Sequence, residues 1–339
     1  MFAGLRAAII WIEYTKELNT YMKNNRINTY TSTGYKLLRH GFLLDQWAQK
    51  RPIPHSLQVA LTEVCNLNCK FCSVKNRSKK YEFNLAELIS ATHKFIELGT
   101  KSVEITGGGE PLCYKNISNY IHYLHERNMK IGLITNGINI NDILDAEVRS
   151  YIDWIRISAN VFDYTKKIET PIEFPGTLGF SYVWTDDIST LDILRQIRDI
   201  AIANNIEYIR VVPNCLGNKQ EQNKKNKYLA QIATILGYPF FFQRKEFNTP
   251  LACYWGYFKP FLYPDGYVYP CSSVVLNSDA DKQFHESYRL CHWTDVDDIW
   301  KNLPISSLID TQKCDHCVFI EQNEILNYSL HSQKHEDFI

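Results

Sequence analysis

The stretch Cys65-Asn66-Leu67-Asn68-Cys69-Lys70-Phe71-Cys72 carries three cysteines at C-x3-C-x2-C spacing, and it follows an apolar, strand-like run through Leu57, Val59 and Leu61. A structural zinc site or an ordinary iron–sulfur site normally takes four protein ligands. A compact loop with three thiolates therefore favours a cubane cluster with one iron open to a non-protein ligand. Two alternatives stay open at this point: a zinc site with a distant fourth ligand, and three unrelated thiols.

This cysteine loop resembles that of the radical S-adenosylmethionine (AdoMet) superfamily, in which the amino and carboxylate groups of AdoMet supply the missing ligand. The resemblance implies a [4Fe–4S] cluster on Cys65, Cys69 and Cys72, with the Phe71 ring beside the adenine of AdoMet. A second segment, Thr106-Gly107-Gly108-Gly109-Glu110-Pro111, resembles the glycine motif of the family. By position, Gly107, Gly108, Gly109 and Glu110 would receive the methionine amino group of AdoMet.

Composition limits the classes of protein that fit. Of 339 residues, 45% are hydrophobic and 22% charged, with Lys+Arg and Asp+Glu equal at 37 each. That balance argues against a protein coated for non-specific nucleic-acid binding. The early apolar run at residues 7–12 is too short to span a bilayer. Because many of the ten cysteines have metal-type spacings rather than those of a disulfide framework, we expect a cytoplasmic protein with reduced thiols.

From residue 51 onward, the sequence alternates between strand and helix patterns. We expect strands at 57–62, 102–106, 131–135, 154–158, 179–184 and 208–212. We expect helices at 84–98, 117–126, 142–150, 188–204 and 228–236, with a loop at 219–227. This alternation predicts an α/β fold, a partial (β/α)6 TIM-like barrel, with a doubly wound sheet as the architectural alternative.

Three regions are expected. Residues 1–50 would form a helical N-terminal extension, 51–245 the barrel and 246–339 a small α+β domain. The last of these includes a hairpin at 261–269, with Pro264-Asp265-Gly266 as its turn.

Functional residues of parallel barrels lie at the carboxyl ends of the strands. The cysteine loop, the glycine motif and several polar residues all fall there. Thr135, Asn136, Ser158 and Asn160 carry hydroxyl and amide groups suited to the ribose and carboxylate oxygens of AdoMet, or to simple loop capping. Cys215 follows the sixth strand, at the mouth of the barrel.

Strand alternation places further polar side chains on the inner face of the barrel. These residues are Glu104, Arg156, Tyr208 and Arg210. Buried charges need partners or a ligand. They are therefore candidates for contacting the substrate or transferring protons, and the alternative is an internal set of salt bridges.

The late cysteines suggest a second metal centre. Cys253 and Cys271 flank the hairpin, and Cys314 and Cys317 form a C-x2-C pair. Zinc held by four thiolates fits the same spacing. The arrangement resembles the twitch domain, the shorter relative of the SPASM domain, which implies an auxiliary [4Fe–4S] cluster. Cys113, Cys215 and Cys291 are left unassigned, although Cys291 could replace one auxiliary ligand.

The resemblance implies reductive cleavage of AdoMet to a 5′-deoxyadenosyl radical, with an electron donor such as flavodoxin or ferredoxin. The cysteine arrangement is similar to that of twitch-containing dehydrogenases that act on 2-deoxy-scyllo-inosamine. We therefore expect oxidation of a polar small molecule, with the auxiliary cluster as electron acceptor. Modification of a peptide or protein, or of a nucleotide or nucleic acid, are alternatives. A non-enzymatic zinc or iron–sulfur module is the opposing hypothesis.

Overall fold

The computed structural model describes residues 29–75, 77–214, 219–244, 249–275, 286–314 and 317–331. One ten-stranded sheet organises this part of the chain, in the order β10-β9-β8-β1-β2-β3-β4-β5-β6-β7. The strands in chain order are β1 (Ser56–Ala60), β2 (Ser102–Thr106), β3 (Lys130–Thr135), β4 (Trp154–Ser158), β5 (Thr177–Trp184), β6 (Tyr208–Pro213), β7 (Phe240–Phe242), β8 (Phe261–Leu262), β9 (Tyr267–Tyr269) and β10 (Cys291–His292).

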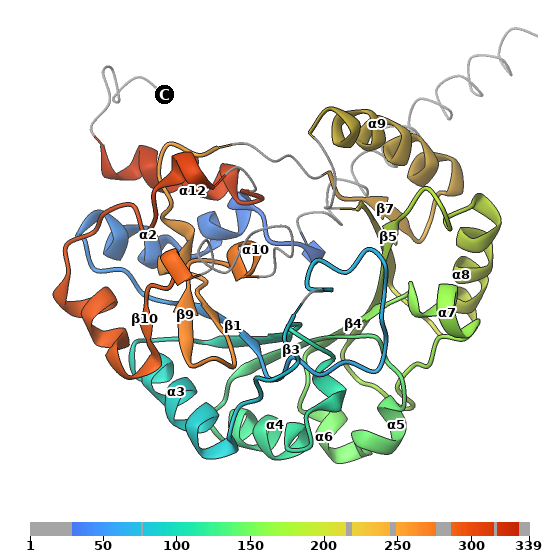
Figure 1. Ribbon diagram of the computed structural model, residues 1–339, viewed down its shortest axis with the longest axis horizontal. Helices are drawn as coiled ribbons and strands as arrows, with labels where there is room; N and C mark the ends of the chain where they lie inside the picture. Colours follow the sequence, from blue (N-terminus) through green and yellow to red (C-terminus); the bar gives the residue numbers. More distant parts are fainter. Residues whose placement is uncertain are drawn as a thin grey trace, which may run out of the picture.

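Strands β1 to β7 are parallel and stand side by side in chain order. A doubly wound sheet would reverse its strand order at a switch point. The uninterrupted order therefore excludes that alternative and confirms the partial barrel. Figure 1 shows the sheet curled into an open trough, with the connecting helices on its outer side.

The connecting helices follow the expected alternation. They are α3 (Leu85–Glu97), α4 (Ile117–Glu126), α5 (Ile140–Ile143), α6 (Ala146–Ser150), α7 (Val161–Thr165), α8 (Leu191–Ala203) and α9 (Lys219–Leu236). In α3, the Asn84 side chain caps the first turn by accepting a hydrogen bond from Ala86 N at 2.9 Å. Gly99, with φ of +105°, lies just after the helix and ends it, because glycine adopts this backbone conformation readily.

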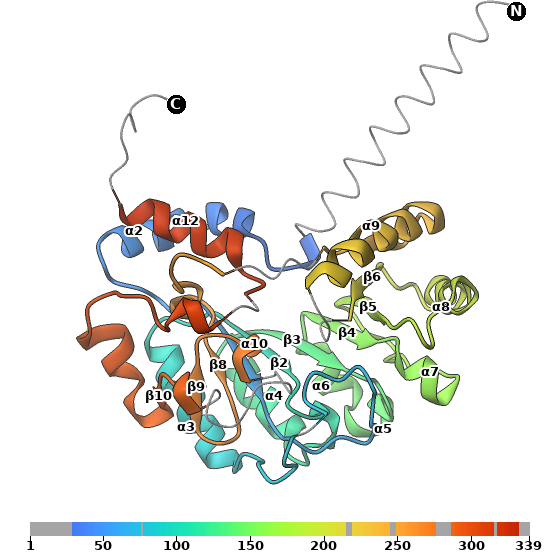
Figure 2. The same cartoon turned by 45° about the horizontal axis from the view of Figure 1, so that its top comes forward.

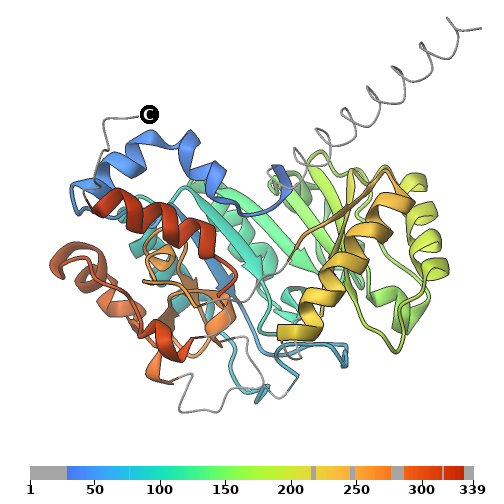
Figure 3. The ribbon, with the colours of Figure 1, turned by 90° about the horizontal axis from the view of Figure 1, so that it is seen from above.

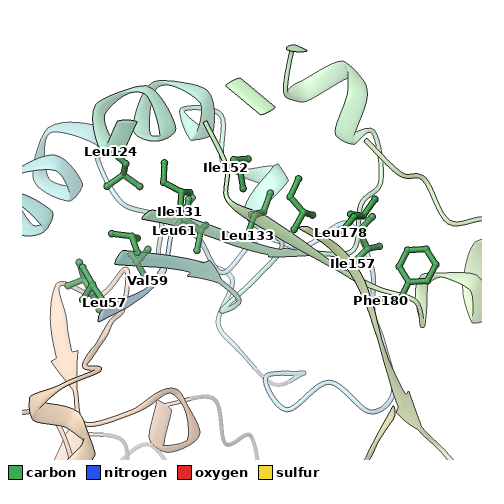
Figure 4. Close-up of a cluster of buried hydrophobic side chains, with 14 of the residues drawn as sticks. Leu57, Val59, Leu61, Leu124, Ile131, Leu133, Ile152, Ile157, Leu178 and Phe180 are labelled. Carbon is green, nitrogen blue, oxygen red and sulfur yellow. The ribbon is translucent and has the colours of Figure 1, made fainter. Parts of the chain in front are cut away.

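The core lies between the outer face of the sheet and these helices. Figure 4 shows Leu57 and Val59 of β1, Ile131 and Leu133 of β3 and other apolar side chains gathered on that face. Leu88, Ala91, Thr92 and Phe95 form the buried stripe of α3 that covers it. Because side chains alternate along a strand, burying these residues turns the intervening ones toward the concave side.

Two expectations about helices and one about strands are wrong. Residues 219–227 were expected to be a loop, but they begin α9, since Lys, Gln and Glu are good helix formers and Leu229, Ile232 and Ala233 supply an apolar face. The single helix expected at 142–150 is two short helices, because Asp145 caps a new start by accepting from Val148 N. Strand β7 was not expected at all.

The C-terminal hairpin extends the barrel sheet. Strand β8 pairs parallel with β1, and β9 pairs antiparallel with β8 in the expected register Phe261↔Tyr269. Gly266, with φ of +85°, forms the turn. The short element η3 (Trp255–Tyr257) precedes the hairpin, and α10 (Ser272–Val275), η4 (Trp293–Asp295), η5 (Asp298–Asn302) and η6 (Thr311–Lys313) follow it.

The first and last described elements of the chain lie side by side. The N-terminal elements η1 (Gly34–Arg39) and α2 (Gly41–Ala48) lie beside α12 (Ile320–Leu330), as Figures 2 and 3 show from two further directions. Trp47 Nε1 donates a hydrogen bond to Leu326 O at 2.9 Å. No helix among the described residues has an apolar stretch long enough to cross a bilayer.

Candidate functional site

A cavity of about 1070 Å³ occupies the concave side of the sheet. Sites for one drug-sized ligand usually measure about 300–1,000 Å³. Loop residues at the carboxyl ends of β1 and β2 line one part of it, and strand side chains together with residues of the N-terminal and C-terminal parts of the chain line the rest. The cavity is therefore large enough for more than one small ligand.

The cysteine loop opens directly into this cavity. Cys65, Phe71 and Cys72 line it. Burial raises the pKa of the Cys69 thiol to about 11, and the neighbouring Cys72 and Cys65 act in the same direction. The three sulfur atoms thus lie close enough to oppose one another's ionisation. A positively charged iron centre would relieve that opposition, so the donor set fits the cluster expected from the sequence.

The glycine motif packs against the cysteine loop. A Cβ atom on Gly109 would lie 2.0 Å from Val64 O, so only glycine fits there. Glu110 N donates a hydrogen bond to the same carbonyl oxygen at 2.8 Å. Gly107, Gly108 and Gly109 also line the cavity. The two motifs therefore form one continuous wall, which is the arrangement that a shared ligand would need.

Glu110 anchors the strand ends behind this wall. Its buried carboxylate accepts hydrogen bonds from Leu112 N at 3.0 Å, from Asn136 N at 2.7 Å and from the Thr135 hydroxyl. Burial raises the pKa of Glu110, while these hydrogen bonds act against the rise. Asn136 Nδ2 continues the network to Asn66 Oδ1 of the cysteine loop at 2.7 Å.

Ser158 and Asn160 differ in what their side chains contact. Ser158 lines the cavity. Asn160 is buried, and its amide exchanges hydrogen bonds with Val183 N at 2.7 Å and Val183 O at 2.9 Å. It thereby ties the end of β4 to β5. Contacts of Thr135, Asn136, Ser158 and Asn160 with AdoMet stay predictions.

The inward orientation expected from strand alternation is present. Glu104, Arg156, Tyr208 and Arg210 all line the cavity. Lys259 Nζ lies 3.1 Å from Glu104 Oε2 in a buried ion pair. Burial alone would raise the pKa of Glu104, but the charges of Lys259 and Arg156 lower it below its ordinary value. The expected salt-bridge set is thus realised for Glu104.

The two arginines are held differently. Arg156 Nε donates to the Tyr208 hydroxyl at 3.2 Å, and its Nη2 donates to the Tyr30 carbonyl oxygen at 3.0 Å. Arg210 donates to Ser181 Oγ at 2.8 Å and to Gln243 Oε1 at 2.9 Å. Both guanidinium groups therefore use neutral acceptors.

Sequence reasoning missed several residues of the cavity. Gln58 lies on the inner face of β1, and the alternation that identified Glu104 would have identified it too. Lys259 precedes the hairpin in sequence and carries no local signal for its partner. Tyr30, in the expected helical extension, stacks on Tyr208 with ring centroids 4.1 Å apart.

The four auxiliary cysteines surround a second, smaller cavity. Cys253, Cys271, Cys314 and Cys317 line it together with Trp255 and Phe319. Burial raises the pKa of Cys271 to about 12, and Cys314 and Cys317 add to the rise. No group of three or more His, Cys, Asp or Glu side chains in the described ranges could hold a single metal ion. Four thiols around one space are a donor set that fits an iron–sulfur cluster or zinc.

The unassigned cysteines lie elsewhere. Cys291 is in β10 and is not among the residues that line the second cavity. Cys113 ends the short helix η2 (Pro111–Cys113), next to Glu110. Burial raises the pKa of Cys113, and the Glu110 carboxylate adds to the rise. Cys215 falls outside the described residues, so its prediction has no structural counterpart.

A buried carboxylate joins the cysteine loop to the C-terminal hairpin. Glu63 Oε1 accepts a hydrogen bond from the Tyr263 hydroxyl, and Glu63 Oε2 accepts from Ser78 Oγ and Lys80 N. Burial raises the pKa of Tyr263, and the bond to Glu63 adds to the rise. The motif-bearing loop is therefore fixed from the C-terminal side of the chain, which no sequence pattern indicated.

Comparison with known protein families identifies the domain that carries these motifs. Residues 59–178 match the family model described as the Radical SAM superfamily. The matched range includes the cysteine loop, the glycine motif and Ser158.

Comparison with curated proteins finds relatives of part of the chain. A GTP 3′,8-cyclase of Actinobacillus pleuropneumoniae is 32% identical over 113 residues, which cover 32% of this chain and 33% of the cyclase. An S-adenosylmethionine-dependent nucleotide dehydratase of Lacinutrix mariniflava is 28% identical over 163 residues, 45% of this chain and 34% of the dehydratase. The matches thus span about a third of the length of these relatives.

A solved structure shares the fold over most of the chain. Streptococcus suis SuiB bound to its precursor peptide SuiA aligns with a TM-score of 0.52 at 16% identity, covering 82% of this chain and 76% of that one. SuiB bound to S-adenosylmethionine aligns with a TM-score of 0.51 at 17% identity, covering 86% and 80%. At this identity the likeness concerns the fold.

Proposed function

This chain carries a radical SAM domain at residues 59–178, and on that basis we propose that it cleaves AdoMet reductively and abstracts hydrogen from a polar small molecule. The observation that supports this is the shared wall of one cavity, formed by Cys65, Cys72 and Gly107–Gly109 with the inward-facing Glu104 and Arg156. The motifs expected to bind AdoMet and the side chains expected to contact the substrate therefore line the same cavity.

The residues present fit the groups that this chemistry needs. Cys65, Cys69 and Cys72 would hold a [4Fe–4S] cluster. Phe71, Gly107–Gly109 and Ser158 would contact AdoMet. When bound, the cluster and AdoMet supply an electron and a 5′-deoxyadenosyl radical. The chain itself positions the target carbon, and its buried lumen keeps water from the radical.

An auxiliary cluster is part of the proposal. Cys253, Cys271, Cys314 and Cys317 would hold it, as in a twitch-like domain, and the cluster would supply an acceptor for the second electron of an oxidation. The cavity that all four cysteines line supports this ligand set. The chain would then work in the cytoplasm with a donor such as flavodoxin or ferredoxin, where thiols stay reduced.

Nucleotide modification is the second candidate for the substrate class. It is favoured by the names of the relatives, a GTP cyclase and a nucleotide dehydratase. Binding to nucleic acid is supported less, because two lysines that could contact phosphates are paired with carboxylates. Lys225 Nζ lies 2.8 Å from Asp186 Oδ2, and Lys70 Nζ lies 3.5 Å from Asp187 Oδ2. Modification of a peptide remains the third candidate.

Anaerobic reconstitution tests the proposal. We expect about eight irons per chain, and about four in the Cys65→Ala variant. With dithionite and AdoMet, the intact protein should form 5′-deoxyadenosine and the variant should not. Cys291→Ala, which removes a partly buried thiol outside both cysteine sets, is the matched control. A non-enzymatic module would bind metal without cleaving AdoMet, and that result would refute the proposal.

A further inference from the structure

Positive charge exceeds negative charge in the middle of the large cavity. Arg156, Arg210 and Lys259 line it, as does Lys36, which is itself exposed, against the single carboxylate of Glu104 at that level. Asp153 also lines the cavity, but its Oδ1 lies 2.8 Å from Lys130 Nζ. Cations without matching anions are costly to bury, so this excess needs a physical reason.

Arg156 is fixed in place by its surroundings. Its guanidinium carbon lies 5.2 Å from the centroid of the Trp154 ring, and Tyr208 accepts from its Nε. Both rings fit because the neighbouring strands carry glycine. A Cβ on Gly132 would lie 2.1 Å from Trp154, and one on Gly179 would lie 2.1 Å from Tyr208. Two strand positions, Gly132 and Gly179, thus have no side chain, which leaves room for the two rings that contact Arg156.

Arg210 lies on β6, two strands away from Arg156, and also faces the cavity. Its partners, Ser181 Oγ and Gln243 Oε1, are neutral. Burial, together with the like charge of Arg156, lowers the pKa of Arg210 to about 9. Within the described part of the chain, both guanidinium groups therefore donate hydrogen bonds to neutral acceptors, and the nearby carboxylate of Glu104 is shared between them and Lys259.

The position of these cationic side chains along their strands places them relative to the expected AdoMet site. Glu104, Arg156 and Arg210 each stand two residues before Thr106, Ser158 and Val212, which line the cavity near the strand ends. Two residues of a strand measure about 7 Å. The cations thus lie one layer of side chains below the glycine motif. An anion held there would leave the rest of its molecule near the strand ends.

We propose that Arg156 and Arg210, assisted by Lys259 and Lys36, form a subsite for a phosphate group of the substrate. The planar guanidinium group has the geometry for paired hydrogen bonds to phosphate oxygens. Gln58 Oε1 has no hydrogen-bond partner among the described residues and lines the same level, so it can accept from a substrate hydroxyl or amine. This inference rests on the proposed function and narrows its substrate to phosphate-bearing small molecules.

Binding measurements on the anaerobically reconstituted full chain, with AdoMet present, test the subsite. The probes are GTP, guanosine, glucose 6-phosphate and inorganic tripolyphosphate, titrated by calorimetry. We expect at least one phosphate-bearing probe to bind about 10- to 100-fold more tightly than guanosine. This ratio of dissociation constants corresponds to the free energy of one hydrogen bond between charged groups. The affinities of GTP and glucose 6-phosphate are then compared, to decide whether the phosphate group belongs to a nucleotide or to a sugar phosphate.

Variants assign the effect to the subsite. Arg156→Gln and Arg210→Gln should remove the preference for phosphate, and Arg210→Lys should keep part of it. Arg195→Gln on the exposed surface of α8 makes the same charge change outside the cavity and should leave the preference intact. Circular dichroism and iron content verify folding. If a glutamine variant does not fold, the phosphate preference of Arg210→Lys and of the wild-type chain still decides whether the subsite exists.

Two results would overturn the subsite. One is equal binding of guanosine and every phosphate probe by the wild-type chain. The other is an unchanged phosphate preference in folded Arg156→Gln and Arg210→Gln. Formation of 5′-deoxyadenosine, measured on the same samples, keeps the two proposals apart: phosphate binding without AdoMet cleavage would refute the proposed function alone.

Discussion

The hydroxyl of Tyr263 donates a hydrogen bond to Glu63 Oε1 at 2.6 Å, although the two residues are 200 positions apart in the sequence. Tyr263 follows β8, and Glu63 immediately precedes the cysteine loop. The side chain of Tyr263 would also lie 3.0 Å from a Cβ atom on Gly108. One tyrosine therefore packs beside the glycine motif and bonds to the segment that leads into the cysteine loop, from outside the range 59–178 that matches the family model.

Replacing Tyr263 with phenylalanine should weaken this connection. The buried Glu63 oxygen would lose its partner, at a cost of about 1–3 kcal/mol in the free energy of unfolding. Denaturant unfolding measures that cost, and iron content after reconstitution should fall in the first cluster. Tyr267→Phe is the matched control, since its ring packs on His292 and Arg289 in the same hairpin. Equal stability of the two variants would contradict the prediction.

Gly109→Ala should displace the cysteine loop. The new Cβ atom would meet backbone atoms of Glu63 and Val64, which cannot move aside as a flexible side chain could. Overpacking of this kind costs about 1–3 kcal/mol. We expect lower iron incorporation and slower formation of 5′-deoxyadenosine. Gly41→Ala, where a Cβ atom meets nothing within 4 Å, should leave both measurements unchanged.

The Glu104–Lys259 ion pair should matter for stability. Removing one partner of a buried pair leaves an uncompensated charge and costs about 3–5 kcal/mol, so Lys259→Met should lower the free energy of unfolding by that order. The double variant Glu104→Gln/Lys259→Met should recover part of the loss. Lys130→Met, which breaks an exposed pair with Asp153, should change stability little. A double variant as unstable as the sum of its singles would contradict the coupling.

Cys271 makes the stability of the cluster-free protein dependent on alkaline pH. Its pKa is raised from 9.0 to about 12, by burial first and by Cys314 and Cys317 next. The unfolded chain therefore loses this proton at lower pH than the folded chain does. The corresponding stabilisation is complete below pH 9.0 and falls as pH rises toward 12. In denaturant unfolding, the free energy of unfolding of Cys271→Ser should decline less steeply between pH 9 and 11 than that of the wild-type protein. Identical slopes of stability against pH would exclude Cys271 as the origin of the decline.

Much of the barrel could be predicted from the sequence because its signals are local. Strand β2 alternates so regularly that its bounds and its inward-facing Glu104 follow from five residues. Asn84 and Gly99 likewise mark the ends of α3 by their own chemistry. Strand β7 could not be predicted, because three successive phenylalanines have no alternation and pair only once β6 stands beside them.

The site was predictable only in part, for a similar reason. The metal motifs are compact in sequence, whereas the partners of charged lumen residues come from distant segments. Lys259 reaches Glu104 across 155 positions, and Tyr30 reaches Arg156 across 126. Nothing near Lys259 or Tyr30 in the sequence distinguishes them from surface residues. Their role emerges from the folded arrangement alone.

The parallel pairing of β8 with β1 has a consequence for biosynthesis. Strand β1 leaves the ribosome early, but one of its edges is covered only when Phe261 and Leu262 arrive some 200 residues later. Contacts of such high sequence separation form slowly. This edge of β1 is therefore unpaired until residue 262 has been synthesised, and the cysteine loop that follows β1 gains its full surroundings only after that point.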